Sequence, residues 1–97
     1  MSYRITEYTK SRARAIGVEV KPSRTQGKKI DVFKNGKKVA SVGALGYADY
    51  PTYMRLEREG KVDKGVAAIR RKSYKARHQK DRLVRGSAGY YADQLLW

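Results

Sequence analysis

The dipeptide Asn35-Gly36 separates two extended runs, at 30–34 and 37–42, and it constrains the fold more than any other stretch of the sequence. Both central residues of a two-residue hairpin turn need a positive φ, which asparagine and glycine adopt at low cost. The flanking runs contain several β-branched residues, which favour strands. The pattern therefore predicts a β-hairpin. Because an isolated hairpin is only marginally stable in water, helices are expected to pack on it.

A two-residue turn also fixes the pairing register of the hairpin, with Val32 opposite Val39 and Phe33 opposite Lys38. In this register both faces of the hairpin are partly apolar. One face would carry Ile30, Val32 and Val39, and the other would carry Phe33, Ala40 and Val42. We expect helices to cover one face, and either the chain end or a partner to cover the other.

A third short strand is expected at 18–20, where two valines flank Glu19. The polar stretch 21–29 follows, contains Pro22 and Gly27, and is predicted to be a mobile connection. Together with the hairpin, this strand would complete a small sheet.

Capping residues mark two short helices. Thr6 can cap a helix over 7–16, which Gly17 would end. Asp49 can cap a second helix, with Pro51 in its first turn. Both helices would show an apolar side to the sheet.

The rest of the chain is predicted to be helical. Asp63 can cap a long helix over about 64–84, which Gly86 ends, and Ser87 can cap a short last helix. The long helix would pack through a narrow seam formed by Val66, Ile69, Ser73, Ala76 and Leu83. This order predicts an α+β fold in one domain, 1–97. In it, a β-hairpin packs against an N-terminal helix, a long basic helix and a short aromatic C-terminal helix.

The chain is strongly basic, with 23 Lys and Arg against nine Asp and Glu and a net charge of +14. The excess runs through the whole sequence and does not form a separate tail. At this charge, self-repulsion disfavours the compact state, and an acidic partner relieves it. DNA, RNA and an acidic protein surface all fit that description.

Eight cations gather in the predicted long helix and just after it. These candidate contacts for phosphates or for an acidic partner are Arg70, Arg71, Lys72, Lys75, Arg77, Lys80, Arg82 and Arg85. They would lie nearly all round one helix, as on rods that follow phosphates. A solvated face, a nucleic-acid interface and an acidic-protein interface remain three interpretations of this run.

The last eight residues of the sequence are rich in aromatic and apolar side chains. Five of them form a predicted apolar anchor: Tyr90, Tyr91, Leu95, Leu96 and Trp97. A chain end frays unless it is tied down, and such a cluster in water would lower solubility. We expect the anchor to dock on the hairpin through Phe33 and Val42; insertion into a partner's pocket is the alternative.

The sequence argues against catalysis. It has no cysteine and one histidine, His78, whereas nucleophilic triads and metal sites need several such groups. The acidic cluster of Glu57, Glu59 and Asp63 is explained by charge pairing along a helix. We therefore predict no catalytic residue, no metal site and no cofactor. Without a long apolar run, we also predict a soluble intracellular protein.

Three segments carry a resemblance: 29–50, with its paired strands and Gly-x-x-Gly-aromatic exit; 77–82, around Arg-His; and 86–97, with its Leu-Leu-Trp end. Their order resembles a family of small basic proteins of large nucleocytoplasmic DNA viruses, including viruses that infect chlorella. The resemblance implies a component of the virion, present in the host cytoplasm or nucleus during assembly. It implies no catalytic or binding residue.

Charge and resemblance together favour a non-enzymatic viral structural protein. The first hypothesis is a minor capsid or cement component that binds acidic capsid-protein surfaces. The alternative is a nonspecific DNA- or RNA-binding protein that neutralises or packages the viral genome. Neither hypothesis involves a small-molecule substrate or a membrane span.

Overall fold

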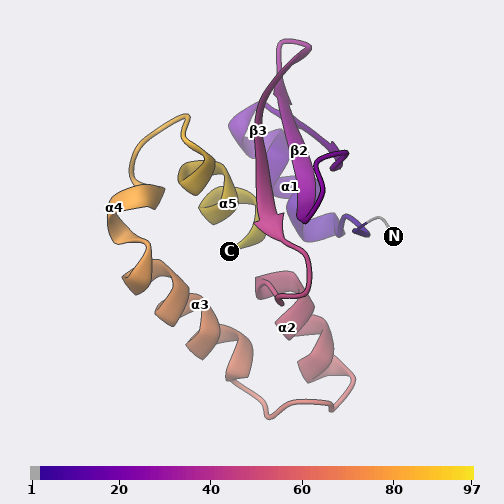
Figure 1. Cartoon of the computed structure of the whole chain (residues 1–97). Coiled ribbons are helices and arrows are strands. Elements are labelled where there is room, and N and C mark those ends of the chain that lie inside the picture. Colours follow the sequence, from indigo (N-terminus) through magenta and orange to yellow (C-terminus); the bar gives the residue numbers. More distant parts are fainter. Residues whose placement is uncertain (1–2) are drawn as a thin grey trace.

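A three-stranded antiparallel sheet with the order β1-β2-β3 forms one half of the molecule (Figure 1). The computed structural model describes residues 3–97. The strands are β1 (Glu19–Pro22), β2 (Lys28–Lys34) and β3 (Lys37–Ala44). Helices accompany the sheet, so the predicted α+β fold, including a third strand, is confirmed.

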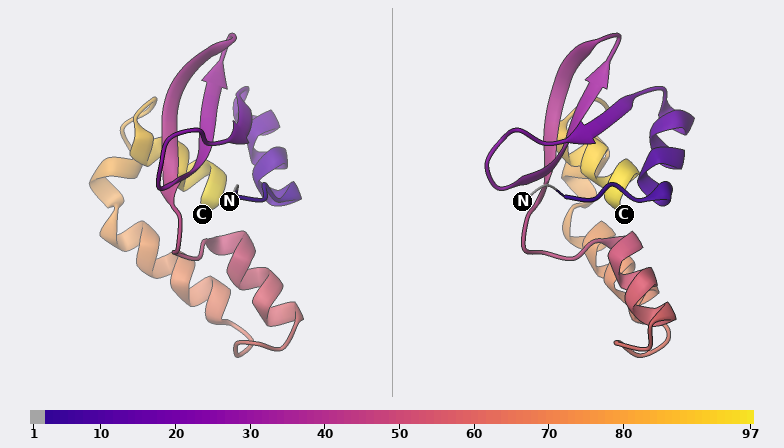
Figure 2. Two further views of the ribbon diagram at one scale, coloured as in Figure 1. Left: turned by 45° about the vertical axis from the view of Figure 1, so that its right-hand side comes forward. Right: turned by 90° about the vertical axis from the view of Figure 1, so that its right-hand side faces the viewer.

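The helices are α1 (Glu7–Ile16), α2 (Tyr50–Arg58), α3 (Val66–Arg77), α4 (Gln79–Arg82) and α5 (Ala88–Leu96). α5 packs against both β3 and α1, and together α1 and α5 cover one face of the sheet. α2 and α3 pack on each other beyond the end of the sheet that is opposite the hairpin turn (Figure 2). α4 leads the chain back from α3 to α5.

The predicted hairpin turn is confirmed. Asn35 and Gly36 have φ angles of 53° and 78°, and Lys34 pairs with Lys37 across the turn. Phe33 lies opposite Lys38, as expected. The turn forms because these two residues adopt a positive φ at low cost.

The predicted register is wrong beyond Phe33. A bulge between Val32 and Phe33 shifts the pairing, so that Val32 lies opposite Ala40. A bulge places one extra residue on one strand, and here that residue is Val39, which is 41% exposed. Val39 therefore does not share the core face with Val32.

The bulge brings Ile30, Val32 and Val42 onto a single face of the hairpin. Ile30 pairs with Val42, and these two side chains join Val32 in the buried core. The core cluster consists of Ala13, Val18, Ile30, Val32, Val42, Tyr91, Leu95 and Leu96. Phe33 is outside this cluster, and the Lys21 ammonium lies 5.2 Å from the centre of its ring.

The segment between β1 and β2 is tied to a buried carboxylate. Asp31 accepts hydrogen bonds from the hydroxyls of Ser23 and Ser41 (2.6 Å each) and from the backbone N–H of Arg24. The strands extend into 21–29, because β1 runs to Pro22 and β2 begins at Lys28. The mobility of this connection stays a prediction.

Three predicted helix caps are confirmed. The side chains of Thr6, Asp49 and Ser87 each accept a hydrogen bond from the backbone N–H three residues on, which starts α1, α2 and α5. Gly17, with a φ of 74°, ends α1 at the predicted position. These boundaries depend on residues close in sequence, and local chemistry is enough to place them.

The predicted helix over 64–84 is wrong at both ends. Gly65 has a φ of 98°, so α3 begins only at Val66. Its first turn is capped by Glu57 of α2 in place of Asp63: the Glu57 carboxylate accepts from the N–H groups of Gly65 (3.0 Å) and Ala67 (2.6 Å). Those hydrogen bonds lower the pKa of the Glu57 carboxyl.

The helix then breaks at His78, and α4 turns toward α5. The Arg82 guanidinium spans the break by donating through Nε to the Lys75 carbonyl at 3.1 Å. α4 can approach α5 closely because Gly89 has no side chain. A Cβ there would lie 2.8 Å from the Cβ of Asp81.

The predicted packing seam of the long helix is also wrong. Ile69 and Leu83 are 66% and 64% exposed. α3 instead packs through Ala67, Arg71 and Tyr74, on a neighbouring face. Ala67 is buried on that face, and the larger side chains of Arg71 and Tyr74 beside it are half-buried. No helix in residues 3–97 has the length and apolar content that a membrane span requires.

Candidate functional site

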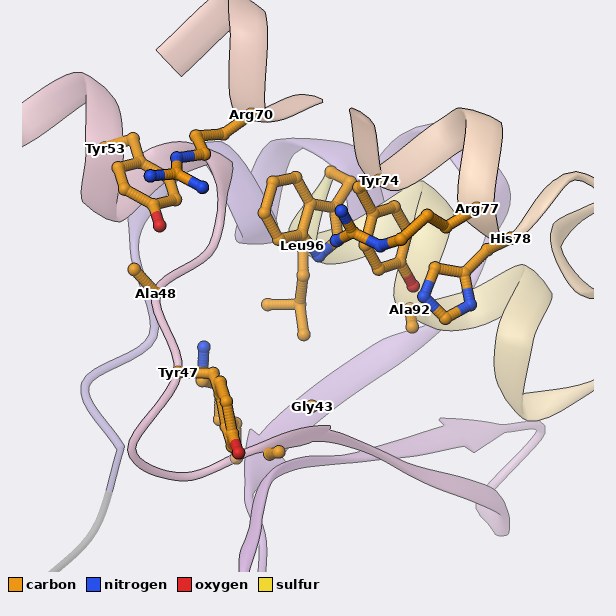
Figure 3. Close-up of a pocket in the computed structure, with 13 residues that line it drawn as sticks. Gly43, Tyr47, Ala48, Tyr53, Arg70, Tyr74, Arg77, His78, Ala92 and Leu96 are labelled. Atoms are coloured by element: carbon orange, nitrogen blue, oxygen red, sulfur yellow. The ribbon is translucent and has the colours of Figure 1, made fainter. Parts of the chain in front are cut away.

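A cleft of about 470 Å³ lies where α2, α3, the 45–49 loop and the chain end meet (Figure 3). Its lining residues are Lys29, Gly43, Ala44, Tyr47, Ala48, Tyr53, Arg70, Tyr74, Arg77, His78, Ala92, Leu96 and Trp97. Five of these carry rings and three carry a permanent positive charge. No Asp or Glu side chain belongs to the lining.

One wall of the cleft is a stack of three rings. The Tyr74 ring lies between His78, with centroids 4.3 Å apart, and Trp97, with centroids 4.4 Å apart. Tyr74 and His78 are four residues apart at the end of α3, which places them on the same side of the helix. Trp97 reaches the stack from the end of α5.

The opposite wall carries two further tyrosines. Tyr53 comes from α2, and its ring centroid is 6.4 Å from that of Trp97, with the two planes tilted by 47°. Tyr47 comes from the loop after β3, and it is 75% exposed. Figure 3 shows both tyrosines across the cleft from Leu96 and Tyr74. The two walls leave an open space bounded by flat rings.

Two guanidinium groups point into this space. The side chains of Arg70 and Arg77 extend from α3 over the cleft (Figure 3). The Arg70 guanidinium lies 5.8 Å from the centre of the Tyr53 ring, a cation–π distance. Within residues 3–97, neither arginine forms an ion pair with a carboxylate. Both charges are therefore available to a ligand.

Lys29, the third cation of the lining, is already paired. Its ammonium donates to Asp49 at 2.9 Å, and both side chains are buried. The same carboxylate accepts from the Tyr3 hydroxyl at 2.6 Å and from the Thr52 N–H at 3.0 Å. This cluster holds the loop and α2 against β2.

Burial alone would raise the pKa of the Asp49 carboxyl. Hydrogen bonds from Thr52 and Tyr3 and the charge of Lys29 outweigh it, so the pKa is lowered. Burial, followed by the hydrogen bond to Asp49, raises the pKa of the Tyr3 hydroxyl. These shifts favour the carboxylate form of Asp49 and the neutral phenol of Tyr3.

The eight candidate cations divide into two groups. Those exposed to solvent are Arg70, Lys72, Arg77, Lys80 and Arg85. The other three face the protein. The Arg71 guanidinium lies 4.8 Å from the Tyr50 ring centre, Lys75 donates to Asp93 at 2.8 Å, and Arg82 bonds the Lys75 carbonyl. These three join α3 and α4 to neighbouring helices.

The apolar anchor docks on the chain's own sheet. Leu95 and Leu96 are 0% and 1% exposed, and Tyr91 is buried with them in the core, while Tyr90 and Trp97 pack against its edge. The Thr9 hydroxyl donates to the Leu95 carbonyl at 2.8 Å and fixes the helix from the α1 side.

The anchor contacts only part of the predicted docking surface. Val42 belongs to the same core cluster as Leu95, as expected, whereas Phe33 lies outside that cluster. The bulge after Val32 explains the difference, because it moves Val42 rather than Phe33 onto the face that the helices cover.

The cleft itself was missed by sequence reasoning. Tyr47 and Tyr53 are close in sequence, but Tyr74 and Trp97 lie more than twenty and more than forty residues further on, and only the tertiary fold brings the four rings to one cleft. The one available signal was composition: the chain has eight tyrosines and one phenylalanine. Tyrosine combines an apolar ring with a polar end and suits surfaces that bind partners.

Within residues 3–97, no group of three or more His, Cys, Asp or Glu side chains could hold a metal ion. The chain matches no protein-family model, no curated protein and no solved structure. The viral resemblance of its sequence therefore stays a prediction, and the function rests on the geometry of the cleft and the distribution of charge.

Proposed function

We propose that the protein is a non-enzymatic nucleic-acid-binding protein that neutralises phosphate charge. This was the alternative to docking on an acidic capsid protein. In the setting that the sequence resemblance implies, the nucleic acid is the genome of a large DNA virus, and the protein belongs to the virion.

The observation that carries the proposal is that exposed cations lie on every part of the fold. Lys10 of α1, Lys37 at the hairpin turn, Arg58 of α2 and Lys80 of α4 are all exposed, and none is in an ion pair within residues 3–97. The hairpin turn, α1, α2 and α4 lie in different directions from the centre of the molecule (Figures 1 and 2). A protein that docks on one capsid surface needs cations on one face only, whereas a flexible polyanion can contact several.

Three acidic groups are paired with lysines inside the fold, so the excess positive charge of the chain is carried by exposed cations that have no such partner. Asp31, Asp49 and Asp93 are buried, and each is bonded to groups of the chain itself. Their negative charge is therefore used inside the fold and does little to offset the exposed cations. The surface as a whole is left favourable to phosphates, whose contacts dominate nonspecific binding.

The cations of α3 include a pair suited to following a phosphate backbone. Arg70 and Arg77 are seven residues apart, which places them on the same side of the helix about two turns apart. Guanidinium groups bind phosphates through paired N–H donors. The cleft thus lies next to two positions where a strand could be held.

The test is the salt dependence of binding to a labelled 20-base-pair DNA, followed by fluorescence anisotropy. The logarithm of the affinity should fall with the logarithm of salt by about 0.9 per phosphate contact. The triple variant R70Q/K72Q/K80Q should reduce this slope by roughly 2 to 3. R70K/K72R/K80R is the matched control, since it keeps the charges and should keep the slope.

Absence of binding to this duplex and to its separated strands, at low salt as well as at about 150 mM, where exposed charges are screened beyond ~8 Å, would contradict the proposal. Acidic capsid protein would then be the better candidate partner.

A further inference from the structure

We propose that the aromatic cleft holds an unpaired nucleobase while Arg70 and Arg77 bind the phosphates beside it, so that the protein prefers single-stranded over double-stranded nucleic acid. This inference rests on the proposed function and specifies its ligand. Phosphate neutralisation alone would give no such preference.

The shape of the cleft fits a flat ligand. Three of its rings form one stack, in which Tyr74 lies between Trp97 and His78 with plane angles of 6° and 28°. Tyr53 and the exposed Tyr47 face this stack from the other wall. The volume of about 470 Å³ falls within the ~300–1,000 Å³ of typical ligand sites. Tyr53 and Trp97, with centroids 6.4 Å apart, already form an aromatic pair, so a base would enter the part of the cleft beside the exposed Tyr47.

The charge around the cleft specifies the rest of the ligand. Arg70 and Arg77 reach over it, neither is paired with a carboxylate of residues 3–97, and no acidic side chain lines it. Lys29 is neutralised by Asp49. A flat apolar group with negative charge on either side satisfies both the rings and the arginines. A base within a strand is such a group.

The base must be unpaired to use this site. In a duplex each base is covered on both faces by its neighbours, and an enzyme or binding protein reaches it only after it leaves the stack. Stacking on aromatic side chains tolerates any base, since every base has a π-face. The site would therefore recognise single-stranded character, and not sequence.

Trp97 provides the measurement, because it is the single tryptophan of the chain and lines the cleft. The full-length protein is titrated with a single-stranded eight-nucleotide DNA, with an abasic strand of equal length and charge, and with an RNA of the same sequence. We expect both base-containing strands to change the Trp97 fluorescence and to bind about tenfold more tightly than the abasic strand. The abasic strand should leave the fluorescence unchanged.

Two variants test whether the preference for base-containing strands arises at the cleft. Tyr47→Ala removes an exposed ring and should remove most of the tenfold preference while keeping the affinity for the abasic strand. Leu83→Ala removes an exposed apolar side chain outside the cleft and should change neither affinity. Circular dichroism of each variant confirms that its fold is intact.

Two results separate the inference from the proposed function. Equal binding of base-containing and abasic strands with unchanged Trp97 fluorescence would overturn the inference and leave phosphate binding in place. Failure of every strand to bind, even at low salt, would overturn the proposed function. A fluorescence change with an acidic aromatic peptide, but with no oligonucleotide, would overturn both.

Discussion

Tyr74 and Trp97 stack face to face, with ring centroids 4.4 Å apart and planes 6° apart. This contact joins α3, which carries the cations, to the last residue of the sequence. The basic helix and the aromatic chain end, which the sequence presents as separate features, therefore form one surface. The stack is both a structural contact and one wall of the candidate ligand site.

The stack should be measurable as a coupling free energy. In a double-mutant cycle with Tyr74→Leu and Trp97→Leu, we expect the two substitutions to be non-additive by about 0.5–1.5 kcal/mol, the usual value for an aromatic pair. Urea denaturation of the four proteins measures it. Additive changes would show that the stack contributes no coupling free energy.

Removal of residues 95–97 should unfold the isolated protein. Leu95 and Leu96 are fully buried against the sheet, and a buried Leu→Ala substitution alone costs about 2–5 kcal/mol. That range is a large part of the stability of a small domain. Circular dichroism and thermal unfolding of the truncated chain measure the loss. A truncated protein that still unfolds cooperatively would instead favour insertion of the anchor into a partner.

Two glycines allow a matched comparison. Gly36 and Gly43 have similar φ angles, 78° and 82°, so alanine is strained by a similar amount at either position. At Gly43 a Cβ would also lie 2.7 Å from Cδ1 of Leu96, whereas at Gly36 nothing lies within 4 Å. We expect Gly43→Ala to cost about 1–3 kcal/mol more than Gly36→Ala. Equal melting temperatures would show that Leu96 does not pack against β3 at this point.

The buried pair of Lys29 and Asp49 should make the free energy of unfolding decrease as the pH becomes acidic. Asp49→Asn leaves the Lys29 charge unpaired and should cost about 3–5 kcal/mol at pH 7. The pKa of Asp49 is lower in the folded protein than in the unfolded chain. Its stabilising contribution is therefore complete above the ordinary pKa of about 4 and is lost as pH falls below it.

Urea denaturation of the wild-type and Asp49→Asn proteins between pH 7 and pH 2.5 tests this. The difference in their free energies of unfolding should narrow below about pH 4, since only the wild type loses the contribution of the ionised Asp49 carboxylate. Glu7→Gln, which alters an exposed ion pair, is the control and should show little difference at any pH. If the difference in the free energy of unfolding between the wild type and Asp49→Asn stays constant with pH, the pKa of Asp49 is not lowered by folding.

Elements governed by local chemistry could be predicted from the sequence. Asn35-Gly36 forms the turn, and Thr6, Asp49 and Ser87 begin helices, because each acts on residues within a few positions. The start of α3 could not be predicted in this way, because it depends on a contact between two helices. Glu57 of α2 caps α3, which no pattern around Asp63 indicates.

The contrast between local chemistry and contacts between elements also explains which parts of the candidate site could be predicted. The exposed positions of Arg70 and Arg77 agree with their charge, but the inward orientation of Lys75 depends on Asp93, eighteen residues away. The cleft forms only because the tertiary fold places Tyr47 and Trp97, fifty residues apart in sequence, in the lining of the same cavity. Composition predicted an acidic partner, and only the tertiary structure brings together the rings and arginines of the proposed site.

The most direct test is a chemical-shift map of the isotopically labelled protein during titration with single-stranded DNA at about 150 mM salt. We predict that the largest shifts occur at Tyr47, Tyr53, Arg70, Arg77 and the indole N–H of Trp97, and that the exposed hairpin turn shifts much less. Shifts centred on the hairpin, or no shifts at the cleft under conditions of saturating binding, would contradict the account.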